Sequence, residues 1–162
     1  MASVQNDTMT VTLRPVQPDD QAFLLELYAG TRLDELKLID WNEDQKQAFI
    51  RMQFDARRLQ YRHRYQLADD SIILQGSQPI GRMLVDRNEK QIVLVDIALS
   101  PEHRNAGIGT RLVQSLLDEA AGTKKSVRLR VVTTNPAVRM YERLGFSTVD
   151  DNGSYLEMNW AG

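Results

Sequence analysis

The chain contains no cysteine and only two histidines, His63 and His103. Without cysteine it has neither a disulfide framework nor a thiolate nucleophile. Two histidines that lie far apart in the sequence also give no cluster with the spacing of metal ligands. We therefore expect a protein without a metal site, which is held together by an ordinary hydrophobic core.

Long apolar runs are also missing. No stretch approaches the roughly 18 apolar residues of a membrane-spanning helix, and residues 1–12 lack a basic region followed by an apolar run. We therefore expect a cytoplasmic protein that makes no contact with a membrane. With 162 residues, of which 42% are hydrophobic and 26% charged, the chain has the size of one compact domain covering residues 1–162.

A surplus of positive charge is absent as well, because the formal net charge is −2 at pH 7. General affinity for nucleic acid requires an excess of Lys and Arg. Residues 57–65 do mix arginines with tyrosines, a composition that some nucleic-acid-binding surfaces share. The solvated side of a helix explains this run more simply, so we predict no nucleic-acid partner.

The residue pattern predicts a mixed α/β fold. Residues 91–99 are almost continuously apolar, which is typical of a strand covered on both faces at the centre of a sheet. A helix and another strand follow, and such a β-α-β unit has parallel strands. The expected strands are 9–16, 71–74, 79–85, 91–99, 127–132, 146–149 and 155–160, and the expected helices are 23–28, 42–67, 108–122 and 136–144.

A glycine-containing turn, residues 100–110, follows the central strand and leads into the helix that begins near Ile108. The first amides of a helix lack intrahelical partners and carry partial positive charge. Glycines let a ligand approach the main chain closely, and Arg104 adds a fixed charge. The turn therefore predicts a phosphate-binding site.

A second motif lies at residues 135–146. Asn135 is a preferred N-cap, Pro136 suits the first helical position, and Gly145 suits a left-handed C-terminal position. These signals predict a short helix on which Ala137, Tyr141 and Leu144 share one face. Tyr141 should therefore point toward the sheet.

Together, the two motifs resemble those of the GCN5-related N-acetyltransferase (GNAT) family. Residues 104–109 are similar to its Arg/Gln-x-x-Gly-x-Gly/Ala pyrophosphate loop, and residues 135–146 to its second motif. The resemblance covers about residues 79–160 and implies a GNAT-like α/β (α+β mixed sheet) fold. In this fold a central, splayed, mostly antiparallel sheet contains a parallel β-α-β core and is flanked by helices. Many members have glycine where this chain has Asn105, a residue type that tolerates left-handed backbone angles.

The resemblance implies that acetyl-CoA binds in a gap between strands 91–99 and 127–132. The main chain of Ile97 and Leu99 would pair with the pantetheine arm, and Asn135 would bond a pantetheine amide. The 3′-phosphate would meet Arg143 or one of two lysines, Lys124 and Lys125. The implied cofactor-binding residues are Ile97, Leu99, Arg104, Asn105, Ala106, Gly107, Ile108, Gly109, Thr110, Asn135, Ala137, Tyr141 and Arg143.

The resemblance also implies direct attack of a neutral amine on the thioester. Tyr141 would protonate the departing thiolate, although the same tyrosine could merely fill space between helix and sheet. Asp96 is the one ionisable residue in the strand 91–99 and is a candidate general base. Two alternatives stay open, in which Asp96 anchors backbone amides or ordered water removes the proton. The amide of Leu99 would stabilise the oxyanion.

We therefore expect an acetyl-CoA-dependent N-acetyltransferase that acts on a primary amine of a small molecule through a ternary complex. Two alternatives stay open: an acetyltransferase for protein N-termini or lysines, and a non-catalytic module that binds CoA. Dimers are common among relatives, so a homodimer is one expected assembly.

Overall fold

The computed structural model describes residues 10–162, except the side chains of residues 33 and 34. Its contacts divide the chain into two compact units. The first comprises Met1–Arg82 and Ala98–His103, and the second Met83–Ile97 and Arg104–Gly162. The prediction of a single domain over residues 1–162 stays a prediction.

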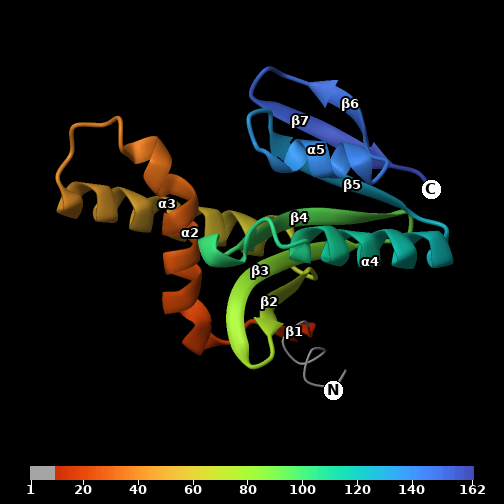
Figure 1. Cartoon of the computed structure of the whole chain (residues 1–162), viewed down its shortest axis with the longest axis horizontal. Helices are drawn as coiled ribbons and strands as arrows, with labels where there is room; N and C mark the ends of the chain where they lie inside the picture. Colours follow the sequence, from red (N-terminus) through yellow and green to blue (C-terminus); the bar gives the residue numbers. More distant parts are fainter. Residues whose placement is uncertain (1–9) are drawn as a thin grey trace. The chain divides into compact units, whose positions relative to one another are not determined.

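Within residues 10–162, seven strands form one mixed sheet in the order β1-β2-β3-β4-β5-β7-β6 (Figure 1). β4 and β5 are parallel, as the β-α-β pattern predicts, whereas β1 and β2, β5 and β7, and β6 and β7 pair antiparallel. The mixed sheet confirms the predicted fold class. The strands are β1 (Val11–Pro15), β2 (Asp69–Gln75), β3 (Gln78–Arg87), β4 (Gln91–Leu99), β5 (Ser126–Val132), β6 (Ser147–Asp151) and β7 (Tyr155–Trp160).

Four α-helices and two short 3₁₀ turns are found within residues 10–162, and none of these helices is long and apolar enough to cross a membrane. The expected helix 42–67 ends earlier, at Arg64, because Tyr65 has a non-helical backbone with φ −125° and ψ 60°. The predicted strand start at Met9 lies outside the described residues. The helical elements are η1 (Pro18–Asp20), α2 (Gln21–Leu36), α3 (Glu43–Arg64), η2 (Pro101–His103), α4 (Ile108–Thr123) and α5 (Ala137–Arg143).

In the first unit, α2 and α3 pack together over a core that contains Leu24, Phe54 and Ile72. The start of α3 is fixed by a capping box. The Asn42 side chain accepts from the amide of Gln45 at 2.8 Å, and the Gln45 side chain accepts from the amide of Asn42 at 3.0 Å. These bonds satisfy helix amides that would otherwise lack partners and begin the helix where the sequence predicts.

In the second unit, α4 contacts β5 through the apolar stripe that the sequence predicts. Most of this stripe is buried, whereas Leu112 is half-buried. On the sheet, alternate residues of β5 are buried, as expected for a strand with one core-facing side. The buried residues of α4 are Ile108, Val113, Leu116, Leu117 and Ala120.

Candidate active site

The parallel ladder between β4 and β5 is short. It joins residues 91–94 of β4 to residues 126–129 of β5, although β4 continues to Leu99 and β5 to Val132. On its other side, β5 pairs with β7 along residues 127–132, beyond the end of the ladder to β4. The ladder therefore ends where the family resemblance implies that the two central strands separate.

Residues 104–110 of the glycine turn lie in the second unit, and two of them have left-handed backbone angles. Asn105 has φ +60° and Gly107, the N-cap of α4, has φ +82°. Asparagine and glycine are the residue types that accept this conformation at least cost, so Asn105 preserves the turn where many relatives have glycine. A Cβ on Gly107 would meet nothing within 4 Å, and glycine is therefore required there for its backbone angles.

The turn leads directly into the first turn of α4, and the amide of Arg111 donates to the carbonyl of Gly107 at 3.1 Å. The amides that precede Arg111 in the helix, those of Ile108, Gly109 and Thr110, belong to the group that has no intrahelical acceptor in any α-helix. They carry the partial positive charge of the helix N-terminus. This arrangement suits a pyrophosphate.

The second motif forms α5, one residue later than predicted. The N-cap is Pro136 rather than the predicted Asn135, and Ala137 rather than Pro136 is the first helical residue. The Asn135 side chain instead precedes the N-cap and accepts from the amide of Ala137 at 2.9 Å. Gly145 has φ +104° as predicted, and a Cβ there would lie 3.2 Å from the Trp160 ring.

Tyr141 lies on the inward face of α5 and is only 5% exposed, as the helical spacing predicts. Its ring meets the Phe146 ring edge to face, with centroids 5.6 Å apart. Burial, and second the negative charge of Asp96, raise the pKa of Tyr141 to about 12. The phenol is therefore protonated at neutral pH and can donate a proton or a hydrogen bond.

The two candidate catalytic residues, Tyr141 of α5 and Asp96 of β4, thus lie within the range at which the charge of Asp96 raises the pKa of the phenol. Asp96 is half-buried and lies beyond the end of the β4–β5 ladder. A protonated phenol beside a carboxylate can supply one proton donor and one proton acceptor to the same reaction.

The other predicted site residues occupy both buried and exposed positions. Ile97 and Leu99 are half-buried on β4, and Leu99 belongs to the first unit. Arg143, in the last turn of α5, is exposed. Of the remaining predicted cofactor-binding residues, Ile108 is buried. Three are half-buried: Gly109, Thr110 and Ala137. The exposed ones are Arg104, Asn105, Ala106, Gly107 and Asn135.

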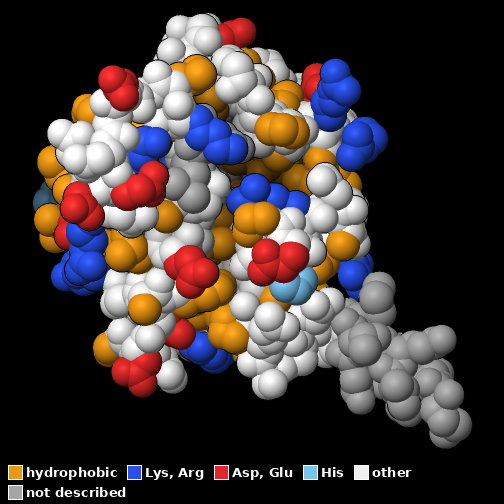
Figure 2. Space-filling model, turned by 60° about the vertical axis from the view of Figure 1, so that its left-hand side comes forward, with side chains coloured by type: hydrophobic (Ala, Val, Ile, Leu, Met, Phe, Trp, Pro, Cys, Tyr) orange, Lys and Arg blue, Asp and Glu red, His pale blue; other side chains and the backbone are white. Residues whose placement is uncertain are grey.

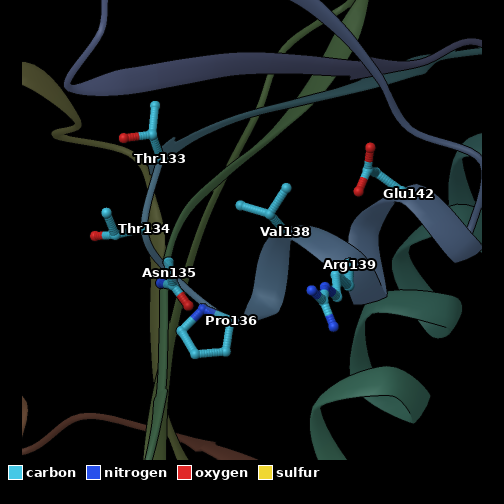
Figure 3. A pocket seen from close by; sticks show the side chains of 7 residues that line it. All are labelled: Thr133, Thr134, Asn135, Pro136, Val138, Arg139 and Glu142. Carbon is cyan, nitrogen blue, oxygen red and sulfur yellow. The ribbon is translucent and has the colours of Figure 1, made fainter.

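A cavity of about 480 Å³ lies between the segment that follows β5 and the exposed side of α5. Figure 3 shows the side chains around it, which come from this segment and from the first two turns of α5. Among the lining residues, Asn135 is the one that the sequence analysis predicts to bind the cofactor, and the others are its close neighbours in the chain. The lining residues are Thr133, Thr134, Asn135, Pro136, Val138, Arg139 and Glu142.

The segment that follows β5 is fixed by its own hydrogen bonds. The amide of Thr133 donates to the carbonyl of Ser154 at 3.0 Å, and its hydroxyl donates to the carbonyl of Gly153 at 3.2 Å. The cavity wall is therefore tied to the β6–β7 turn. Within residues 10–162, no group of three or more His, Cys, Asp or Glu side chains is placed to hold a metal ion.

The comparisons with known proteins agree with this geometry. The model of the acetyltransferase (GNAT) family matches residues 31–146. A curated relative, the mouse cysteine-rich protein 2-binding protein, is 34% identical over 68 residues, which is 42% of this chain and only 8% of that protein.

Two solved structures illustrate the similarity of fold. One is the PaiA N-acetyltransferase of Thermoplasma acidophilum in complex with coenzyme A, with a TM-score of 0.67 and 24% identity over 95% of this chain and 100% of that one. Another is Arabidopsis thaliana Naa50 in complex with a bisubstrate analogue, with a TM-score of 0.62 and 15% identity over 94% and 99%. Since the family model covers most of the sequence, including both motifs of the site, the chain belongs to the GNAT family of acetyltransferases.

Proposed function

We propose that the protein transfers the acetyl group of acetyl-CoA to a primary amine of a small molecule, by direct attack in a ternary complex. The observation that carries this proposal is the pair formed by Asp96 and the protonated, buried phenol of Tyr141. Both residues lie in the same unit as residues 104–110 of the glycine turn, so the amides that would hold the cofactor and the proton donor belong to one compact unit.

The residues of the turn fit the cofactor. The amides of residues 108–110 and the charge of Arg104 would hold the pyrophosphate. The main chain at Ile97 and Leu99 would pair with the pantetheine arm, as an added strand pairs with a sheet edge. Asn135 and Ala137 would contact the same arm, and Arg143, Lys124 or Lys125 would meet the 3′-phosphate. Bound there, acetyl-CoA supplies an activated acyl group.

The chemistry needs a proton acceptor, an oxyanion donor and a proton donor. The amine loses a proton to Asp96, directly or through water, and its nitrogen forms a bond with the acetyl carbon. The amide of Leu99 donates to the oxygen that gains charge. The carbon–sulfur bond then breaks, and Tyr141 gives its proton to the sulfur. The second proton that leaves the acylated nitrogen restores the phenol, directly or through water.

The acceptor is proposed to be cationic before it binds. Exposed acids at Asp40 and Glu43 lie in the segment that joins α2 to α3 and in the first turn of α3, and carboxylates attract a protonated amine. A nucleic-acid partner is disfavoured, because on the face drawn in Figure 2 Lys and Arg side chains are interspersed with Asp and Glu.

Two other functions remain candidates. A protein N-terminus is the alternative acceptor, since one similar structure, Naa50, was solved with the bisubstrate analogue CoA-Ac-MVNAL. A non-catalytic module that binds CoA is the alternative class, because fold alone does not establish activity.

Calorimetry with acetyl-CoA and with CoA, followed by a thiol-release assay, tests the proposal. The acceptors are a panel of small primary amines, a set of peptides with free N-termini, and N-acetylated peptides that contain lysine. Release with small amines supports the proposal, whereas release with peptides alone replaces it with the protein acetyltransferase. Binding without release supports the non-catalytic module. No heat with either form of the cofactor, on folded protein, would refute all three.

A further inference from the structure

The outer face of α3 carries an exposed apolar stripe. Met52 and Leu59 are each 60% exposed, and Ala48 and Ala56 are exposed between and beside them. At about 100° per residue these four side chains fall within an arc of about 80°. This arc faces away from the buried Ile50 and Phe54. A continuous apolar stripe on the outer side of a long helix is typical of an interaction surface.

One flank of this stripe carries charges in a symmetric order. Asp44 lies in the first turn of α3 and Arg62 in the last, with Arg51 and Asp55 between them. All four project on the same side of the stripe, by the helical repeat. Read along the helix, the signs alternate as minus, plus, minus, plus. Read in reverse they are plus, minus, plus, minus, so the flank is complementary to its own reversed copy.

The sizes of the apolar side chains have the same symmetry. The middle of the stripe lies between residues 53 and 54, and Ala48 and Leu59 are equally distant from it. Met52 and Ala56 also lie on opposite sides of this point, at distances that differ by one residue. When the helix is placed against a reversed copy, each large side chain meets a small one. Alternation of large and small side chains is what lets two helices approach closely.

We propose that α3 is the docking surface for a second copy of this chain, in an antiparallel pair with a two-fold axis near residues 53 and 54. A two-fold axis perpendicular to both helices keeps equivalent flanks on the same side. Asp44 of each copy then faces Arg62 of the other. Arg51 and Asp55, which form an ion pair within the helix at 3.3 Å, also face each other between the copies.

The basic end of α3 has a specific role in this arrangement. Exposed Arg62 in its last turn provides the positive charge that meets Asp44 of the other copy, whereas Arg58 donates to the Gln21 side chain of its own chain at 2.6 Å. The contact from Asp44 to Arg62 is about 27 Å long at 1.5 Å per residue. One such helix pair is smaller than a standard protein interface, so we expect a dimer that dissociates in the micromolar range.

Sedimentation equilibrium of the full chain across the micromolar range tests the docking surface. The wild type should dimerise, and Met52→Glu should weaken the dimer by about tenfold or more, because it places two like charges near the axis. Val149→Glu, a matched change at a 50% exposed position of β6, should leave the dimer unchanged. A wild type that stays monomeric, or a dimer indifferent to Met52→Glu, overturns the proposal.

A charge exchange tests the antiparallel register itself. Asp44→Lys and Arg62→Glu should each weaken the dimer, and the double variant should recover most of the lost affinity at low salt. Circular dichroism should show that all three variants stay folded. If the double variant forms a weaker dimer than both single variants, the antiparallel register is wrong.

Since the chain has no cysteine, the pair Ala48→Cys and Leu59→Cys in one chain gives a direct second readout. These positions are too far apart on one helix to join each other. Mild oxidation at a concentration where the wild type dimerises should therefore give dimers linked between chains. A control chain that carries Ala48→Cys together with Val149→Cys should give far fewer linked dimers under the same treatment. Equal yields from the two double variants would contradict α3 as the docking surface.

Discussion

The carboxylate of Asp96 acts electrostatically on the buried phenol of Tyr141 and, after burial itself, is the second cause that raises the pKa of Tyr141 to about 12. The two residues come from different elements, β4 and α5, so only the folded chain brings them together. A tyrosine that is held in its protonated form beside a carboxylate is itself a proton donor at neutral pH.

Replacing Tyr141 by Phe should lower kcat for acetyl transfer by roughly 10²-fold, the usual contribution of one positioned proton donor. KM for acetyl-CoA should change little, because Phe keeps the ring contact with Phe146. Steady-state thiol release measures both parameters. Tyr155→Phe, at a 41% exposed tyrosine, is the matched control and should be neutral. An unchanged kcat for Tyr141→Phe would assign the tyrosine a packing role only.

The sequence predicts the local structure around Asp96, Asn105 and Tyr141 well, because the signals for it are local. The strand 91–99 is found with the predicted bounds, the backbone of Asn105 is left-handed, and Tyr141 points inward from a short helix. Each of these follows from a few neighbouring residues, through apolar runs, turn chemistry or helical spacing. The family motifs add the order of the elements.

Other features depend on contacts between distant residues, which a single sequence does not specify. The place of β7 between β5 and β6, and the end of the β4–β5 ladder at Leu94 and Leu129, are choices of strand pairing. The charge of Asp96 beside Tyr141 is a result of that pairing. The end of α3 at Arg64, three residues before the predicted one, reflects a backbone change at Tyr65 that no proline or glycine announces.

The raised pKa of Tyr141 also predicts how stability depends on pH. In the unfolded chain the phenol has a pKa near 10, so its contribution to stability is fully present below pH 10 and is lost as pH rises toward 12. From pH 9 to pH 11 the wild type should lose about 1.3 kcal/mol relative to Tyr141→Phe. Urea unfolding of both proteins at the two pH values measures this difference, because their other tyrosines are identical. An equal loss of unfolding free energy in the two proteins would contradict this prediction.

Replacing Asp96 by Asn should lower the pKa of Tyr141 while leaving it above its ordinary value of 10.0, because burial is the larger of the two causes. Tyrosinate absorbance near 295 nm, taken as the difference between matched proteins with Tyr or Phe at position 141, reports this pKa directly. The readout does not depend on turnover. A pKa for Tyr141 that stays near 12 in Asp96→Asn would show that burial alone sets it.

The same variant tests Asp96 as the general base. At pH 7 its kcat should fall by roughly 10²-fold, and the deficit should shrink at higher pH as more of the acceptor amine is already neutral. A pH–rate profile with one small amine distinguishes this outcome from simple structural damage, which would lower the rate equally at every pH. A wild-type rate at pH 7 would leave ordered water as the proton acceptor.

Gly107 and Gly122 provide a matched pair of substitutions at the two ends of α4. A Cβ meets nothing within 4 Å at either position, but Gly107 has φ +82° whereas Gly122 is helical. Gly107→Ala should therefore cost about 1–2 kcal/mol of unfolding free energy through backbone strain alone. Gly122→Ala should instead stabilise the protein by about 0.5–1 kcal/mol, because alanine loses less backbone entropy in a helix.

The pair also tests the phosphate site, since Gly107 presents the first amides of α4 and Gly122 is at the far end of the helix. Calorimetry with CoA should show weaker binding to Gly107→Ala and unchanged binding to Gly122→Ala. Dephospho-CoA, which keeps the pyrophosphate, should lose affinity for Gly107→Ala by the same factor as CoA does. If the factor differs strongly between the two ligands, the turn holds the 3′-phosphate rather than the pyrophosphate, and the amides of residues 108–110 must be reassigned.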